Sequence, residues 1–376
     1  MLPTPPRTYA ERTDWLRLIR SENVGPSTFF ALIRRCGSAA RALEEVPRLA
    51  RRGGAATLRL CTLEEATREQ EALAAFGGRL VALGEPDYPR LLAAIEMPPP
   101  LLSVVGHIHL FEKRSVALVG ARNASAAGIR MARVLAQELG AAGLVIVSGL
   151  ARGIDAAAHR GALETGTVAV LAGGLDVVYP QENRELYDAI ARQGVLVSEM
   201  PLGMAPQARH FPRRNRLVSG LSLATVVVEA AERSGSLITA RLAGEQGRDV
   251  MAVPGSPLDP RTRGANRLIR EGAALIQDAT DVLHELEGRK TIALTEPSSA
   301  RDWLDGQCAT EDDEARLQPL RALLLERLGP TPIEIDELVR QIGAEPGELR
   351  TLLIELELAG RLTWHPGQRV SLLPSP

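Results

Sequence analysis

The chain has 376 residues, of which 45% are hydrophobic, so it is long enough for more than one domain and a sizeable core. Its 44 basic and 46 acidic side chains nearly balance, which excludes a surface that is basic throughout. Any nucleic-acid site must therefore be a local patch. No apolar run approaches the roughly 18 residues that span a bilayer, and no signal-peptide pattern is visible, so we expect a cytoplasmic protein without a membrane partner.

The cysteines agree with that compartment. Cys36, Cys61 and Cys308 are scattered and odd in number, which fits a reducing cytoplasm and disfavours disulfides or a structural zinc site.

Residues 1–80 have a helical pattern, with stretches at 14–20, 27–37 and 38–46 that Gly and Pro residues separate. The turn Asn23-Val24-Gly25-Pro26 resembles the hairpin of helix-hairpin-helix or sterile-alpha-motif (SAM) modules. A plain helical packing module is the alternative.

From Ser115 onward, short apolar runs alternate with helical stretches, which is typical of βαβ units in a parallel sheet. Six strands are expected, at 115–121, 143–149, 167–174, 194–200, 224–230 and 249–255. A helix, a short strand and a last helix ending near Gly288 follow them. The predicted fold class of residues 81–288 is therefore α/β, with a Rossmann-like parallel sheet whose ligand lies across the carboxyl ends of the strands.

Residues 289–315 mix Ser, Pro and acidic residues without periodicity, and we expect a linker there. Three helical stretches and a two-strand wing then predict a winged-helix module over 316–376. Its third helix offers Arg350 among acidic residues, so the phosphates of a duplex would repel that helix. We therefore favour protein contact or regulation over duplex reading for this module.

The turn after residues 115–121 contains Gly120, Arg122 and Asn123 but lacks the G-x-G-x-x-G of a dinucleotide site. Only Lys113 and Lys290 are lysines, so a Gly-Lys-Ser/Thr phosphate loop is absent too. No cofactor is therefore expected. The arginine and asparagine still offer donors suited to a phosphate oxygen.

The next two turns add small and polar residues to the same edge, namely Ser148, Gly149, Arg152, Gly153, Gly173 and Gly174. Gly173 and Gly174, in the third turn, indicate either a tight turn or a position where the backbone must lie close to another group. Asp155 is interpreted as a capping carboxylate at a helix start. With His159 it forms either a hydrogen-bonded structural pair or a metal pair, and the lack of a third ligand at a useful spacing favours the former.

The densest positive charge lies between Pro201 and Val228, where four arginines and no acidic residue occur: Arg209, Arg213, Arg214 and Arg216. After the buried strand at 224–230, Ser234-Gly235-Ser236 opens a helix whose unpaired N–H groups favour an anion. Phe211, inside the cluster, suits base stacking or core packing. Glu229, at the strand end, is either a general base or a paired charge.

The series VALVGAR, SGLARGIDAAAH, AGGLDVVYPQEN, FPRRNRLVSGLS, EAAERSGSLITA, GRDVMAVPGSP and GANRLIREGA resembles the DprA/Smf DNA-processing family of bacteria over about residues 80–290. The resemblance implies an extended Rossmann domain between a SAM-like or helix-hairpin-helix-like module and a winged helix. It implies a homodimer without enzymatic activity that binds single-stranded DNA and loads the RecA recombinase onto incoming strands during natural transformation.

The resemblance also implies which residues hold the DNA backbone: Gly120, Arg122, Arg213, Asn215, Arg216, Ser234, Gly235 and Ser236. The expected DNA-binding set is completed by residues of the first three turns and by one aromatic residue: Asn123, Ser148, Gly149, Arg152, Gly153, Gly173, Gly174 and Phe211. Many members have Gly-Ser-Arg in the first turn, whereas this chain has Ala121 at the middle position and lacks that hydroxyl.

Two alternatives come from other function classes. A nucleotide hydrolase resembling the lysine-decarboxylase-like phosphoribohydrolases would need a P-G-G-x-G-T turn, but Arg233-Ser234-Gly235-Ser236 lacks the double glycine. A winged-helix transcription regulator would bind duplex DNA through residues 316–373.

Overall fold

The computed structural model describes residues 4–287, 311–365 and 367–373. The chain forms two compact units. One is the α/β unit within residues 69–296, and the other combines residues up to Arg68 with the carboxyl-terminal residues. We refer to the second as the terminal unit. None of the helices in the described ranges has both the length and the apolar composition needed to cross a bilayer.

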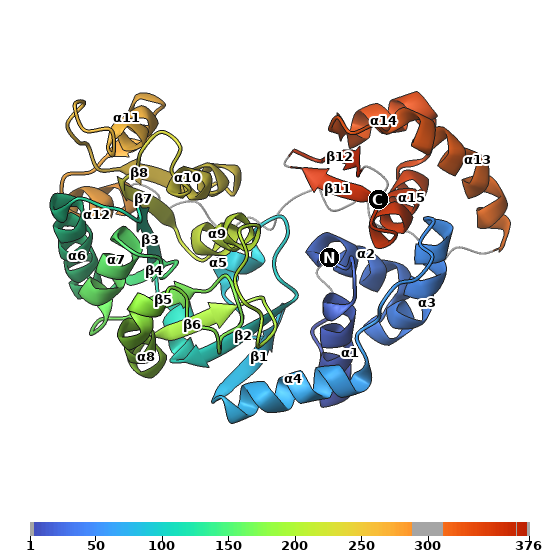
Figure 1. The fold of residues 1–376 in the computed structure, drawn as a ribbon, viewed down its shortest axis with the longest axis horizontal. Coiled ribbons are helices and arrows are strands. Elements are labelled where there is room, and N and C mark those ends of the chain that lie inside the picture. Colours follow the sequence, from blue (N-terminus) through green and yellow to red (C-terminus); the bar gives the residue numbers. More distant parts are fainter. Residues whose placement is uncertain (1–3, 288–310, 366, 374–376) are drawn as a thin grey trace. The chain divides into compact units, whose positions relative to one another are not determined.

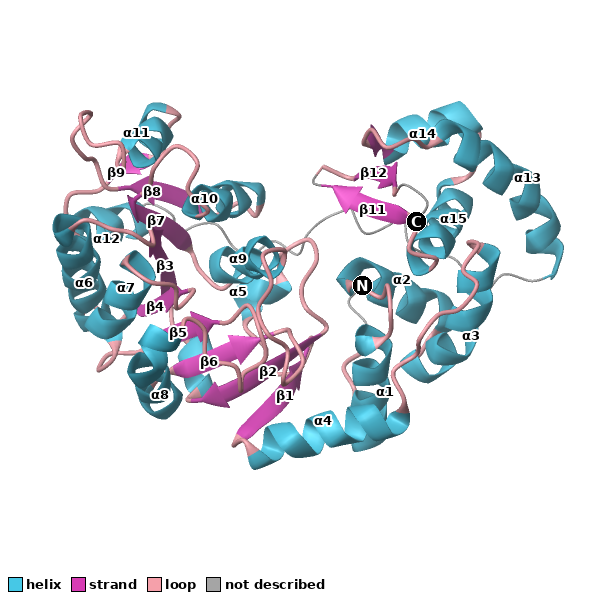
Figure 2. Cartoon of the chain, in the orientation of Figure 1, coloured by secondary structure: helices cyan, strands magenta, loops and turns pink. Residues whose placement is uncertain are grey.

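A nine-stranded sheet forms the α/β unit, in the order β1-β2-β6-β5-β4-β3-β7-β8-β9 (Figure 1; β9 is labelled in Figure 2). The expected parallel strands are all present: β3 (Ser115–Gly120), β4 (Val145–Ser148), β5 (Thr167–Val170), β6 (Val195–Ser198), β7 (Ala224–Glu229), β8 (Asp249–Ala252) and the short β9 (Ala274–Leu275). Every residue of β4, β5, β6 and β7 is buried, as expected for apolar strands covered on both faces.

Two strands that were not predicted extend this sheet. β1 (Gly78–Ala82) pairs antiparallel with β2 (Leu101–Gly106), and β2 pairs antiparallel with β6. The helices of the unit are α5 (Arg90–Ala93), α6 (Ala126–Ala141), α7 (Ile154–Ala162), α8 (Arg184–Gln193), α9 (His210–Gly220), α10 (Ser236–Glu245), α11 (Arg263–Arg270) and α12 (Ala279–Glu287), with 3-10 turns at Ile108–Glu112 and Gln181–Asn183. The buried core includes Leu118 and Val226 of the sheet and Leu135 of α6.

The terminal unit contains the predicted helical module and the predicted winged helix. Its amino-terminal helices are α1 (Tyr9–Arg20), α2 (Pro26–Cys36) and α3 (Ala39–Arg52), and α4 (Leu63–Ala75) runs on into the α/β unit. The winged helix comprises α13 (Glu311–Arg327), β10 (Ile333–Glu334), α14 (Ile335–Ile342), α15 (Pro346–Leu358), β11 (Leu362–His365) and β12 (Arg369–Leu372). α13 begins inside the segment expected as a linker, and residues 289–310 of that segment lie outside the described residues.

Candidate nucleic-acid interface

The carboxyl edge of the parallel strands brings the predicted turns together. β4 and β7 lie on opposite sides of β3, so the strand order reverses at this point. The turns after β3, β4, β5 and β7 all leave the sheet at this edge (Figure 2). In open α/β sheets, ligands bind in the crevice at such a switch point.

Arg122 and Phe211 join the first turn to α9. The Arg122 guanidinium carbon lies 4.8 Å from the centroid of the Phe211 ring, within the range of a cation–π contact. The Tyr179 ring lies beside Phe211, with 5.6 Å between centroids and 51° between planes. Arg122 and Tyr179 are exposed and Phe211 is half-buried, so this edge presents a cation and two aromatic rings next to one another.

The four arginines of the predicted cluster have different environments. Arg209 is exposed, whereas Arg213 and Arg216 both form ion pairs with Glu199, which directly follows β6. The Arg213 Nε lies 2.9 Å from Glu199 Oε1, and Arg216 also donates to the carbonyl of Met97 at 2.6 Å. Sequence reasoning missed Glu199 because this residue lies just before the range without acidic residues. Its two ion pairs neutralise part of the positive charge that the arginine cluster was predicted to carry.

Arg214 is the buried member of the cluster. Its side chain packs on Gly149 so closely that a Cβ at Gly149 would lie 1.4 Å from Arg214 Nη1. Burial lowers the pKa of Arg214 to about 10, while Asp155 opposes the change, so the guanidinium stays charged at neutral pH. Burial also raises the pKa of Asp155, against the influence of Arg214 and two backbone N–H groups. Gly149 is therefore required for packing, and Arg214 supplies charge beneath the edge.

Two polar side chains hold the loop after β4. Asp155 Oδ2 accepts the N–H groups of Gly149 at 3.1 Å and Ala151 at 3.3 Å. The prediction that Asp155 caps α7 is therefore wrong, because its carboxylate anchors the preceding loop. Asn183, which sequence reasoning missed, donates to the carbonyl of Leu150 at 3.0 Å. Leu150 has φ 56°, a left-handed conformation that is costly for leucine, so this hydrogen bond stabilises a strained turn.

The remaining predicted residues of this loop, Ser148, Arg152 and Gly153, differ in their exposure and in the groups that they contact. Ser148 is buried and donates to the carbonyl of Leu118 at 2.6 Å, so its hydroxyl does not reach the surface. Arg152 is exposed and pairs with Glu182 at 2.5 Å. Gly153 has φ 72°, and a Cβ there would lie 2.3 Å from the carbonyl oxygen of Ala121.

The predicted glycines of the other turns also meet groups of this chain. A Cβ at Gly120 would lie 2.6 Å from the side chain of Ile154. A Cβ at Gly173 would lie 2.6 Å from the carbonyl oxygen of Met204, and one at Gly174 would lie 2.5 Å from that of Pro201. Close approach within the chain therefore accounts for these glycines. Asn123, in contrast, is exposed beside Arg122.

The start of α6 is occupied by a carboxylate. Ser125 Oγ accepts the N–H of Gly128 at 2.9 Å and thereby caps the helix. Glu229 Oε1 accepts the N–H of Ser125 at 3.0 Å, and its second oxygen accepts the Ser125 hydroxyl. Of the two roles expected for Glu229, the structure therefore shows the paired charge, and the hydrogen-bonding partner is Ser125 at the start of α6.

The start of α10 differs because no side chain caps it at Gly235. The Ser234 and Ser236 hydroxyls hydrogen-bond to one another at 2.8 Å, and Asn215 of α9 donates to the Gly235 carbonyl at 3.4 Å. Gly235 has open space where a Cβ would lie. The first N–H groups of the helix already have acceptors, because Ser236 donates to Ser234 Oγ at 3.4 Å and Leu237 and Ile238 donate to the carbonyls of Ser234 and Gly235 at 3.1 and 3.2 Å. What this helix start offers an anion is its partial positive charge and its two hydroxyls.

Asp155 and His159 do not form the pair that was expected. His159 is buried, and its Nδ1 hydrogen-bonds to Thr167 Oγ1 at 2.7 Å. Within the described part of the chain, no three His, Cys, Asp or Glu side chains are grouped so that they could hold a metal ion.

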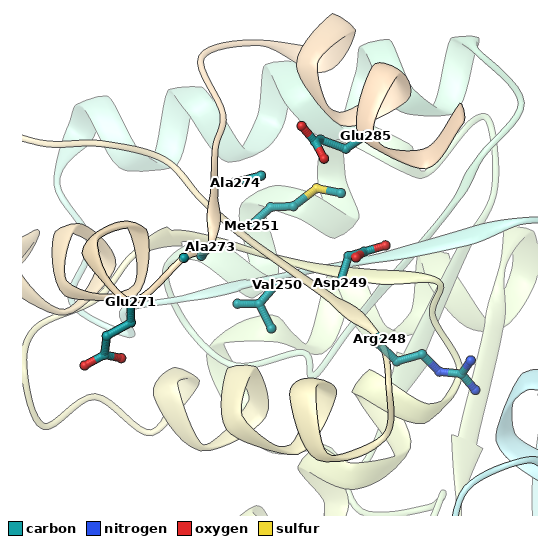
Figure 3. A pocket seen from close by; sticks show the side chains of 9 residues that line it. Arg248, Asp249, Val250, Met251, Glu271, Ala273, Ala274 and Glu285 are labelled. Atoms are coloured by element: carbon teal, nitrogen blue, oxygen red, sulfur yellow. The ribbon is translucent and has the colours of Figure 1, made fainter. Parts of the chain in front are cut away.

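A hollow of about 310 Å³ lies at the amino end of β8, away from this edge (Figure 3). Its charged lining residues are Arg248, Asp249, Glu271 and Glu285. Three carboxylates against one guanidinium disfavour a polyanion, so this hollow is a poor candidate for nucleic acid.

Comparison with known proteins gives matches along most of the chain. A family model described as DNA recombination-mediator protein A matches residues 79–287. Models of a DprA-like N-terminal HHH domain and a DprA winged helix domain match residues 9–72 and 309–368. Protein Smf of Escherichia coli K12 is 38% identical over 291 residues, covering 76% of this chain and 74% of that protein.

Solved structures give a similar result. The chain is 34% identical to DNA processing protein A from Streptococcus pneumoniae, with a TM-score of 0.62, covering 74% of this chain and 99% of that one. It is 31% identical to DNA processing protein A from Helicobacter pylori, with a TM-score of 0.51, covering 56% and 96%. The latter structure is described as giving insight into a single-stranded DNA binding mode.

Proposed function

Because the chain belongs to the DprA/Smf family of DNA-processing proteins, we propose that it is a non-enzymatic mediator of recombination that binds single-stranded DNA at the carboxyl edge of its sheet. The observation that carries the proposal is the placement of Arg122 over Phe211, with Tyr179 alongside. A guanidinium next to aromatic rings offers a single strand what it needs, a cation for phosphate and a surface for a base.

The proposed track runs from this aromatic pair to the start of α10. Arg209 directly precedes α9, and the half-exposed Arg213 lies on this helix. In the proposed track they lie between the first turn and Ser234. Asn215 connects α9 to the open helix start at Gly235. Arginines and backbone N–H groups recognise phosphate oxygens but not base identity, so the binding should depend little on sequence.

The position of Glu229 supports a non-enzymatic role. A phosphoribohydrolase needs a glutamate that is available to its substrate, but here both carboxylate oxygens of Glu229 accept hydrogen bonds from Ser125. Incubation with nucleoside monophosphates should therefore release no free base. Release of base at a rate that depends on Glu229 would contradict the proposal.

The partners proposed for this chain follow from its family. We propose that it acts as a homodimer in the cytoplasm, protects incoming single strands and loads RecA onto them during transformation. A strand-exchange assay with RecA and a single-strand-binding protein tests this function, since the mediator should shorten the lag before exchange begins.

The binding proposal is tested by comparing single-stranded and duplex oligonucleotides over a range of salt concentrations. We expect tighter binding to the single strand and a log–log salt slope of about -0.7 for each phosphate contacted. Affinity that does not change with salt, or a preference for duplex, would refute the proposal.

A further inference from the structure

The third helix of the winged-helix module, α15, is mostly buried, and its Arg350, Thr351 and Glu357 are half-exposed. In winged-helix proteins that read duplex DNA, the solvent-facing side of this helix enters the major groove. Here no residue from Leu349 to Leu358 is exposed. One side of the helix packs into the module's own core through residues that include Leu349, Leu352 and Leu353.

The amino-terminal helices cover the other side of α15, which packs against α2 and α3 within the terminal unit (Figure 1). Ile354 and Leu358 are buried there and lie outside the module's own core cluster. Arg35 at the end of α2 donates to Thr351 Oγ1 at 2.9 Å. A half-exposed side chain of α15 therefore contacts the amino-terminal helices.

The chain just after α3 lies so close to α15 that the two backbones are nearly in contact. A Cβ at Gly53, which follows α3, would lie 1.9 Å from the carbonyl oxygen of Glu355. Arg361 donates to the Gly53 carbonyl at 3.3 Å, just beyond the end of α15. Only glycine allows this approach, so the amino-terminal module has a surface shaped for the helix.

The turn that resembles a helix hairpin also contacts the end of α15. Asn23 donates to the carbonyl of Leu358 at 3.0 Å. The position of a Cβ at Gly25, the residue before α2, lies 4.0 Å from Glu357 Oε1. A helix start favours an anion, and the Glu357 carboxylate supplies one from within the chain. The two elements with DNA-binding resemblance, the hairpin and the third helix, therefore contact one another, although Asn23 itself stays exposed.

The charge of α15 agrees with this arrangement. Glu355 is buried and pairs with Arg321 of α13 at 2.7 Å, and Glu357 accepts the Trp364 indole N–H at 2.8 Å. Both acidic side chains thus have partners within the winged-helix module itself. Towards the phosphates of a duplex, α15 offers Arg350 as its one basic residue, on a helix that also carries Glu348 and Glu357.

We propose that α15 is a protein-docking helix whose partner is the amino-terminal module of the same chain, so that the two terminal modules act as one body and neither reads duplex DNA. The assignment does not depend on the single-strand site, because it rests on residues of the terminal unit alone.

The test uses the full chain with a protease site introduced between residues 289 and 310. After cleavage, the piece carrying α13–α15 should co-elute with the rest of the wild-type protein in size-exclusion chromatography. Elution of this piece at its own size would overturn the proposal. The wild-type experiment is sufficient for this purpose, so the test does not depend on the stability of a variant.

A matched pair of variants then assigns the contact. Gly53→Leu places a side chain against the Glu355 backbone, whereas Gly347→Leu adds the same side chain in the first turn of α15, where no atom lies within 4 Å of the new Cβ. We expect the piece to separate in the first variant and to stay bound in the second. Retention in both would overturn the assigned contact, and single-strand affinity equal to wild type checks that the α/β unit is folded.

Two further measurements address the partner and the duplex. Cysteines placed together at the two contacting positions, as Arg35→Cys and Thr351→Cys, should form a disulfide that leaves the protein at monomer mass on a denaturing gel, whereas a disulfide-linked dimer would overturn assignment to the same chain. Arg350→Ala should leave the duplex affinity of the intact protein unchanged. A loss of duplex affinity in that variant would show groove reading by α15.

Discussion

Replacing Arg122 with alanine removes the exposed cation that lies over Phe211. Each phosphate that a protein neutralises on a single strand contributes about -0.7 to the slope of log affinity against log salt concentration. The loss of one such contact should therefore weaken binding about fivefold at about 0.1 M salt, but only about twofold at about 0.3 M. The effect should be equal for all base sequences, because a guanidinium at the backbone does not read bases.

Fluorescence anisotropy with two labelled single strands of unlike sequence, measured at several salt concentrations, gives both affinity and slope. Arg192→Ala is the matched control, since Arg192 is also exposed but precedes the amino end of β6, away from the proposed track. The reasoning is refuted by a slope that does not change in Arg122→Ala, by an equal loss in the control, or by a loss confined to one sequence.

Two further predictions concern stability. Gly149→Ala places a Cβ 1.4 Å from Arg214 Nη1, so the free energy of unfolding should fall by about 1–3 kcal/mol in a denaturant titration. Gly235→Ala, with no atom within 4 Å of its Cβ, is the control, and equal stability of the two variants would contradict the close packing. Burial lowers the pKa of His159 from 6.5 to about 3, so below about pH 6.5 the unfolded chain binds a proton that the folded chain does not, and stability falls as the pH drops towards 3. Between pH 7 and 5 the free energy of unfolding should fall by about 2 kcal/mol through this residue, and the fall should disappear in His159→Gln. An equal pH dependence of stability in both proteins would disprove the role of His159.

The parallel part of the sheet could be predicted because each strand carries its own signal. Runs such as ATVVVEA at 224–230 are apolar and β-branched, and a helical stretch follows each of them. β1 and β2 lack that signal because they do not alternate with long helices. β2 is placed in the sheet by antiparallel pairing with β6, almost one hundred residues away in sequence, and β1 is placed by pairing with β2. Such a long-range pairing is not visible in local periodicity.

The candidate site was predictable at the level of turns but not of individual side chains. Strand polarity alone brings Arg122 and the start of α10 to one edge. Whether an arginine on α9 points outward or inward depends on what lies beneath the helix. Arg214 is buried because Gly149 leaves room for it and Asp155 balances its charge, and neither relation follows from spacing in the sequence.

The different environments of the arginines also set how strongly salt should affect binding. Glu199 pairs with Arg213 and Arg216 and holds their guanidinium groups in place, which reduces the entropy lost on binding but offsets part of their charge. Arg216 is the more buried of the two and also bonds to a carbonyl, so it contributes mainly to orientation. Arg122, Arg209 and Arg213 remain as exposed or half-exposed cations at the edge. Three phosphate contacts predict a salt slope of about -2 for each chain, which is shallow for a protein that binds DNA. A near-neutral chain can therefore hold a single strand by a few positioned cations, with base stacking supplying the affinity that does not depend on salt.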